Sequence, residues 1–154
     1  RKDGLRVVLE GGFCEPPPAE LLDAIEDAGC LVVDDDQMQG HRWFECAVEG
    51  DGDPLASLAQ AWLKNSVSSS VRYGGALPRA EALVAKVKRS HASGVVFAAA
   101  RFCEPASFDV PPLRAALERE GIPWISLEFE DKPSVFDAIR AQAETFVEAS
   151  LFFA

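Results

Sequence analysis

Features typical of membrane proteins and of nucleic-acid-binding proteins are missing from this 154-residue sequence. No apolar run is long enough to span a bilayer, and no basic segment followed by an apolar one forms a leader. Positive charge is also scarce, because 15 Lys and Arg stand against 25 Asp and Glu. Nucleic-acid affinity depends largely on Lys and Arg that displace counterions. We therefore expect a soluble, cytoplasmic protein that binds neither nucleic acid nor a membrane.

Nucleotide-binding signatures are missing as well. The sequence has no Gly-x-x-x-x-Gly-Lys-Ser/Thr loop, and residues 11–14 do not form the Gly-x-Gly-x-x-Gly turn of dinucleotide-binding folds. Without that turn, the acids Asp34, Asp35 and Asp36 after the second predicted strand are interpreted as helix caps and surface charge.

The four cysteines, at positions 14, 30, 46 and 103, form no Cys-x-x-Cys pair, which argues against a closed zinc site. A disulfide framework is not expected either, since the hydrophobic fraction of 48% is enough to build a core. Cys30 begins an apolar run and Cys46 stands among apolar residues, so both are predicted to be buried core residues.

The sequence does contain a repeat. Phe-Cys-Glu-Pro occurs at residues 13–16 and again at 102–105, each time after an apolar run and before a helix-like segment. In both copies a second apolar run follows a Gly at the end of that segment, at Gly29 and Gly121. This order is typical of parallel strands covered by helices. The repeat therefore predicts two β-loop-α-β units.

We expect residues 1–154 to form one α/β domain that is a piece of a longer protein. The predicted architecture is a three-layer flavodoxin-like fold with about four parallel strands in the order 2-1-3-4. Between the repeats, Asp53 is expected to cap a helix with an inward apolar face, followed by a helix over about 79–91, and a last helix covers 133–153. The members of that inward face are Leu55, Leu58, Ala59, Trp62 and Leu63.

Basic residues are densest on the predicted helix over 79–91. Lys86, Lys88 and Arg89 are interpreted as its solvated side, because Leu83, Val84 and Val87 supply apolar positions for packing.

Cys14 and Cys103 follow buried strands, where α/β folds place their ligands. The next helix directs its positive N-terminus to the same place, which favours a thiolate. The alternative is purely structural: each Phe-Cys pair plugs a strand end, and Pro16 and Pro105 begin helices, where a missing amide costs nothing.

Five segments together resemble the C-terminal part of a catalytic subunit of ATP-dependent benzoyl-CoA reductase, in the wider 2-hydroxyacyl-CoA dehydratase group. The resemblance covers nearly all of the chain, and the Phe-Cys-Glu-Pro step with its strand and helix is its most specific part. The segments are residues 12–17, 28–36, 41–43, 65–67 and 101–105.

The resemblance implies an iron–sulfur enzyme that reduces an acyl-CoA thioester by one electron at a time. In that family a [4Fe–4S] cluster lies between two flavodoxin-like halves, held by three cysteines, and Cys103 matches the one from the C-terminal half. The implied partners are an acyl-CoA substrate, a sister catalytic subunit and an ATP-hydrolysing iron–sulfur activator. The isolated chain is expected to be inactive and to lack the cluster, since it carries one ligand of three.

Other residues near the motif are candidates to support the cluster ligand or to contact the substrate. Phe102 is expected to exclude water beside Cys103. His41 and Arg42 are candidates to contact the thioester or the nucleotide tail of coenzyme A. Cys14, Glu15 and Glu104 complete the set, and the two glutamates are alternatively first-turn acids that favour the helix dipole.

Three functional interpretations stay open. Benzoyl-CoA ring reduction is the first, and 2-hydroxyacyl-CoA dehydration is the second. The third belongs to another class: a flavodoxin-like scaffold or binding module without chemistry.

Overall fold

The computed structural model describes residues 4–11, 17–37, 47–48, 50, 52–65, 76–130 and 132–152. The elements in these segments are, in chain order, β1 (Leu5–Glu10), α1 (Ala19–Asp27), β2 (Cys30–Asp35), α2 (Pro54–Gln60), the π-helical turn η2 (Ala61–Asn65), α3 (Ala76–Arg89), β3 (Gly94–Ala100), α4 (Glu104–Arg119), β4 (Trp124–Phe129) and α5 (Pro133–Phe152).

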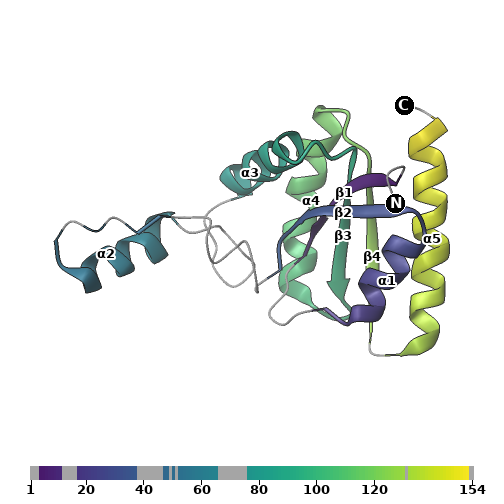
Figure 1. Ribbon diagram of the computed structural model, residues 1–154, viewed down its shortest axis with the longest axis horizontal. Coiled ribbons are helices and arrows are strands. Elements are labelled where there is room, and N and C mark those ends of the chain that lie inside the picture. Colours follow the sequence, from purple (N-terminus) through teal and green to yellow (C-terminus); the bar gives the residue numbers. More distant parts are fainter. Residues whose placement is uncertain are drawn as a thin grey trace.

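The strands form one parallel sheet in the order β2-β1-β3-β4 (Figure 1). This confirms the predicted α/β class and strand order. In the two central strands, Leu9 is paired with Val96 and Glu10 with Phe97. Because β1 and β3 run in the same direction, the loops that follow them both leave the sheet at its carboxyl edge.

Side chains of the central strands alternate between two hydrophobic clusters, one on each face of the sheet. Val7 and Leu9 of β1 pack with α1 and α5 on one face. Val8 packs with α3 and α4 on the other. The apolar patterning of β1 and β3 is thus explained by burial on both faces, which gives the three layers seen in Figure 1.

The two repeated units end their helices in the same way. Gly29 follows the C-cap of α1 with φ of 101°, and Gly121 follows the C-cap of α4 with φ of 68°. Such left-handed conformations are open to Gly without a steric cost. Both glycines therefore end a helix and direct the chain into the next strand, as the sequence predicts.

α4 is continuous from Glu104 to Arg119 although Pro111 and Pro112 lie inside it. Each proline removes a backbone donor from the helix. Apolar packing of the residues after the prolines offsets these lost hydrogen bonds, because Leu113, Ala116 and Leu117 all pack against the sheet.

α2 differs from the prediction. Asp53 caps it as expected, since its side chain accepts a hydrogen bond of 3.0 Å from the Leu55 amide. However, α2 contains no buried residue, and Leu55 is 76% exposed. The prediction of an inward apolar face is wrong. Helical spacing shows that one face of a helix is apolar, but it does not show whether another element packs on that face. α2 projects away from the sheet in Figure 1.

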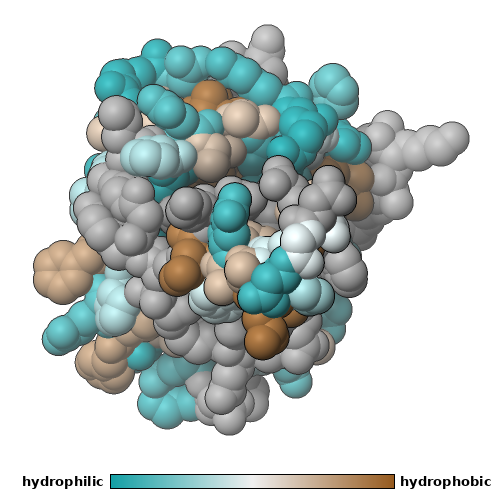
Figure 2. Space-filling view, turned by 90° about the vertical axis from the view of Figure 1, so that its left-hand side faces the viewer, coloured by the Kyte–Doolittle hydropathy of each residue, from teal (hydrophilic) through white to brown (hydrophobic). Residues whose placement is uncertain are grey.

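Exposed apolar side chains therefore gather on the segment of α2 and η2. Figure 2 views the molecule from the side on which α2 lies and shows brown apolar groups at the surface between polar ones. The large apolar side chains that are more than half exposed in this segment are Leu55, Leu58, Trp62 and Leu63.

Within the described part of the chain, no helix has both the length and the hydropathy needed to cross a membrane.

Candidate active site at the carboxyl edge of the sheet

Cys103 lies where β3 gives way to α4. It is the N-cap residue of α4 and is half-buried. Its amide donates to the carbonyl of Ala100 at 3.0 Å, and its own carbonyl accepts from the amide and the hydroxyl of Ser107, both at 3.2 Å. The backbone on both sides of the thiol is therefore held in place, and the first amides of α4 point toward this end of the helix.

Phe102 and Glu104 flank the thiol. Phe102 has φ of 65°, a left-handed conformation that costs free energy in a residue with a side chain. Its ring is 91% exposed, with the Arg101 guanidinium 5.8 Å from the ring centroid. Glu104 is the first residue of α4 and is exposed, where a carboxylate favours the helix dipole.

The other predicted site residues lie outside the described segments. They are Cys14, Glu15, His41 and Arg42. Their positions relative to Cys103 therefore stay predictions. The pairing of β1 with β3 shows only where the two loops begin. Gly11 and Arg101 are the first residues after these neighbouring strands, at the same edge of the sheet.

A buried cluster of charged residues lies at the same edge. Glu10 ends β1, Arg79 and Lys86 come from α3, Asp36 follows β2, and Asp109 comes from α4. Arg79 lies 3.5 Å from Glu10 and 3.9 Å from Asp36, and a shorter contact joins it to Asp109. Lys86 lies 3.6 Å from the other Glu10 oxygen and donates to the Asp35 carbonyl at 3.1 Å.

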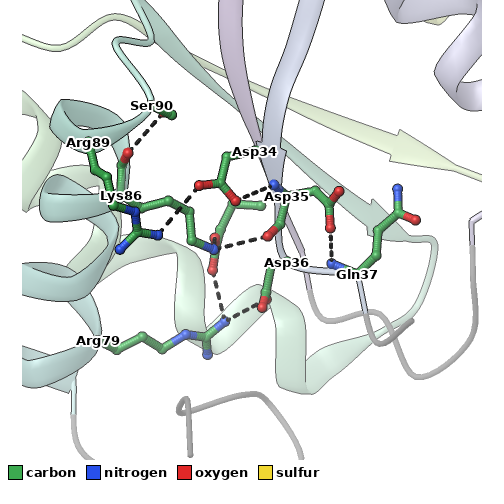
Figure 3. A network of polar contacts seen from close by, with 9 residues as sticks. Asp34, Asp35, Asp36, Gln37, Arg79, Lys86, Arg89 and Ser90 are labelled. Atoms are coloured by element: carbon green, nitrogen blue, oxygen red, sulfur yellow. Dashed lines mark hydrogen bonds and ion pairs between the residues drawn. The ribbon is translucent and has the colours of Figure 1, made fainter. Parts of the chain in front are cut away.

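Figure 3 shows how the helix and the strand contribute to this cluster. Arg79 and Lys86 extend from α3 toward the end of β2, where they meet Asp36 and Asp35. We call Glu10, Asp36, Arg79, Lys86 and Asp109 the edge cluster.

The edge cluster corrects two sequence predictions. The sequence places Lys86 on the solvated side of its helix, but its side chain is only 8% exposed. Asp36 is predicted to be a cap or surface charge, but it is 3% exposed. Lys88 and Arg89 are largely exposed as predicted. Charge alone suggests a surface position for Lys86, whereas the partner that allows its burial, Glu10, is distant in sequence.

The sequence patterns did not single out Glu10 or Arg79. One signal was available: Glu10 directly follows the apolar run of β1 and is itself the last residue of that strand. An acid at the buried end of a strand must find a partner, because an isolated buried carboxylate is costly.

Burial and, to a smaller extent, the nearby Asp36 carboxylate raise the pKa of Glu10, while Lys86 and Arg79 lower it, and the net result is a pKa of about 7. Burial likewise raises the pKa of the Cys30 thiol to about 11, with a smaller contribution from Glu26. Cys30 therefore stays a protonated core thiol, in agreement with its predicted place.

A small cavity of about 10 Å³ adjoins the edge cluster, with Glu10, Gly11, Arg79 and Asp109 among its lining residues. A space of this size holds about one water molecule, provided that polar partners surround it. The carboxyl and guanidinium groups in the wall meet that condition.

Comparison with known proteins places the chain in a family. Residues 1–149 match the family described as 2-hydroxyglutaryl-CoA dehydratase, D-component. The chain belongs to this family. Over 150 residues it is 36% identical to one of the subunits of benzoyl-CoA reductase from Thauera aromatica, a match that covers 97% of this chain and 39% of the relative.

Other relatives of the chain are named as dehydratase subunits. The chain is 31% identical to lactoyl-CoA dehydratase subunit beta of Anaerotignum propionicum, in a match over 95% of the chain and 38% of the relative. It is 27% identical to (R)-2-hydroxyglutaryl-CoA dehydratase subunit beta of Acidaminococcus fermentans, over 96% of the chain and 39% of the relative. The chain thus spans about two fifths of these relatives.

Proposed function

We propose that this chain is part of an iron–sulfur enzyme subunit that reduces an acyl-CoA thioester by one electron, with benzoyl-CoA as the first candidate substrate. Family membership supports an acyl-CoA enzyme, and the 36% identity to a benzoyl-CoA reductase subunit supports ring reduction. The observation that carries the proposal is Cys103, a half-buried thiol at a strand end and a helix N-cap. This is a site where a thiolate is favoured as a ligand.

Cys103 fits a [4Fe–4S] cluster as one ligand. Among the described residues, no three His, Cys, Asp or Glu side chains are arranged to hold a metal ion, so we propose that the remaining cluster ligands come from outside these segments. When bound, such a cluster supplies single electrons at low potential, and its potential depends on exposure and hydrogen bonds to sulfur.

The proposed reaction requires protection from water. One electron added to a ring conjugated with a thioester makes a radical anion at very negative potential, which water would quench. Phe102 is the candidate for shielding, since its exposed ring directly precedes Cys103. We propose that this ring is covered by another part of the full-length subunit or by a sister subunit, and that an ATP-hydrolysing iron–sulfur activator delivers the electrons in the cytoplasm.

Dehydration of a 2-hydroxyacyl-CoA is the second candidate. It is favoured by the family description and by the names of the two dehydratase relatives. Both reactions begin with an electron added to the thioester. Assays of the complete complex with benzoyl-CoA and with a 2-hydroxyacyl-CoA such as lactoyl-CoA would separate them, because the preferred substrate should turn over and the other should not.

The role of Cys103 is tested by a pair of matched substitutions in the full-length subunit. Cys103→Ala should lower the iron content and the visible cluster absorption. Cys30→Ala is the control, because Cys30 is 4% exposed in the core and its thiol stays protonated. Equal iron content in both variants and in the native protein would exclude Cys103 as a ligand. A native protein without colour after anaerobic reconstitution would favour a scaffold.

A further inference from the structure

We propose that Glu10 stores a proton at the carboxyl edge and releases it for the reaction, with Arg79 and Lys86 as positioning residues and Asp109 as the connection to solvent. This inference rests on the proposed function, since it assigns the proton source of that same site.

The first argument is position. Glu10 is the last residue of β1 and is only 5% exposed. It is paired with Phe97 on β3, the strand that leads to Cys103. Glu10 therefore lies at the edge from which the Cys103 loop emerges, where parallel α/β sheets bind their ligands.

The second argument is the charge balance of the edge cluster. It brings three carboxyl groups, those of Glu10, Asp36 and Asp109, together with two cations, those of Arg79 and Lys86. If all five were ionised, one negative charge would remain uncompensated among them. Burial makes an uncompensated charge costly, and a group in that position commonly neutralises instead. One carboxyl group is thus expected to keep a proton.

Contact lengths set Asp109 apart as the ionised partner of Arg79, which leaves Glu10 at 3.5 Å and Asp36 at 3.9 Å from Arg79. Of these two, Glu10 is the one that borders the small cavity. Its oxygens lie 3.5 Å from Arg79 and 3.6 Å from Lys86, longer than the roughly 2.7–2.9 Å of hydrogen bonds between ionised groups. The tightest contact of Arg79 is instead with Asp109. In the described part of the chain, the charged groups that face Glu10 are those of the edge cluster: Arg79 and Lys86 on α3, Asp36 after β2 and Asp109 on α4. The raised pKa of Glu10, about 7, agrees with this assignment.

The third argument is a path to solvent. The cavity of about 10 Å³ is bounded by both Glu10 and Asp109, and it has room for about one water molecule. The side chain of Asp109 is 18% exposed, whereas that of Glu10 is 7% exposed. A proton can therefore pass from solvent to Asp109, through the water and to Glu10.

Both candidate reactions need a proton at one step, although only ring reduction consumes protons overall. In ring reduction the proton joins a ring carbon after the electron has been added. In dehydration it joins the departing hydroxide to make water, and the substrate later returns one proton to solvent when the neighbouring carbon loses its hydrogen and the double bond forms. Glu10 loses the proton, its carboxylate is stabilised by Arg79 and Lys86, and one proton from solvent restores it through Asp109. A carboxyl group with a pKa near the working pH suits this cycle.

The test compares Glu10→Gln with Glu118→Gln in the full-length complex. Glu118 is an exposed acid on α4 that forms an ion pair with Arg114 one turn earlier, so it serves as the matched control. We expect Glu10→Gln to lower kcat about 100-fold or more with little change in KM, and to remove the limb of the pH–rate profile near pH 7. Glu118→Gln should keep the native kcat and profile. An unchanged profile in Glu10→Gln would overturn the proposal.

Infrared difference spectra of the resting protein, without substrate, give a second readout. The native protein should show a protonated-carboxyl band that disappears as pH is raised through about 7, and Glu10→Gln should lack it. If the band is the same in both proteins, Glu10 does not store the proton. If the band behaves as expected but the complex turns over neither substrate, the proposed function fails while the proton store stands.

Discussion

Glu10 combines a structural role with a chemical one. A carboxyl group placed at the end of a buried strand is removed from water, and it remains there because Arg79 and Lys86 face it. Its folded-state pKa of about 7 lies well above the ordinary value of about 4.3. Between these values the folded state binds more protons than the unfolded state. The contribution of Glu10 to stability is therefore fully present below about pH 4 and is lost as pH rises through 7.

Glu10→Gln should abolish the pH dependence of stability that Glu10 causes, because an amide resembles the protonated acid and does not titrate. Urea unfolding of the native chain and the variant at a series of pH values from 5 to 8 tests the prediction. The variant should gain free energy of unfolding relative to the native chain as pH rises, by roughly 1–3 kcal/mol across the series. Parallel stability curves for the two proteins would mean that Glu10 is already ionised at pH 5.

At the scale of elements, α5 packs closely against the start of β3 at Gly94. A Cβ atom at this position would lie 3.0 Å from Cζ of Phe146 on α5 and 3.2 Å from the carbonyl oxygen of Pro123. One neighbour is backbone and the other is a ring that is itself buried. Neither can move without disturbing the packing of α5 on the sheet.

Gly94→Ala should therefore destabilise the chain by about 1–3 kcal/mol, the usual cost of overpacking a filled core. Gly50→Ala is the control, since no atom of the described segments lies within 4 Å of a Cβ built at Gly50, and surface changes of this kind stay within about 0.5 kcal/mol. The midpoint of urea unfolding, compared at an unchanged m-value, measures both. Equal midpoints would contradict close packing at Gly94.

The elements also show where sequence patterns stop being sufficient. In α3, Leu83 and Val87 are buried as their spacing predicts, yet Lys86 between them is buried too. In α2, the spacing of Leu55 and Leu58 is equally regular, yet both are exposed. Periodicity describes the helix alone, while burial depends on the neighbouring element. For α3 that element is the sheet, and none of the described segments covers α2.

At the scale of the whole molecule, the protection of backbone amides from hydrogen exchange should decrease from the sheet to α2. β1 and β3 have neighbours on both sides and helices on both faces, whereas α2 makes its main contacts with η2. Amides in segments with few buried contacts exchange through local opening, which requires little free energy.

Native-state hydrogen exchange of the chain should therefore be slowest for Val8, Leu9 and Val96, which are fully buried in the central strands. It should be fastest, among the described helices, for the amides of α2. Mass spectrometry of peptides from the two regions measures the difference. Similar protection in α2 and in β1 would show that α2 is packed against another part of the chain.

The fold and the candidate site differ in how far local sequence predicts them. Apolar runs, terminal glycines and the repeated Phe-Cys-Glu-Pro are properties of short segments, and they were sufficient to predict the strand order and the place of Cys103 at the end of β3. The edge cluster is different, because β1, α3, α4 and the end of β2 each contribute to it. Its charges meet only when parallel pairing brings those elements to one edge, where burial and mutual contact decide which carboxyl group keeps a proton.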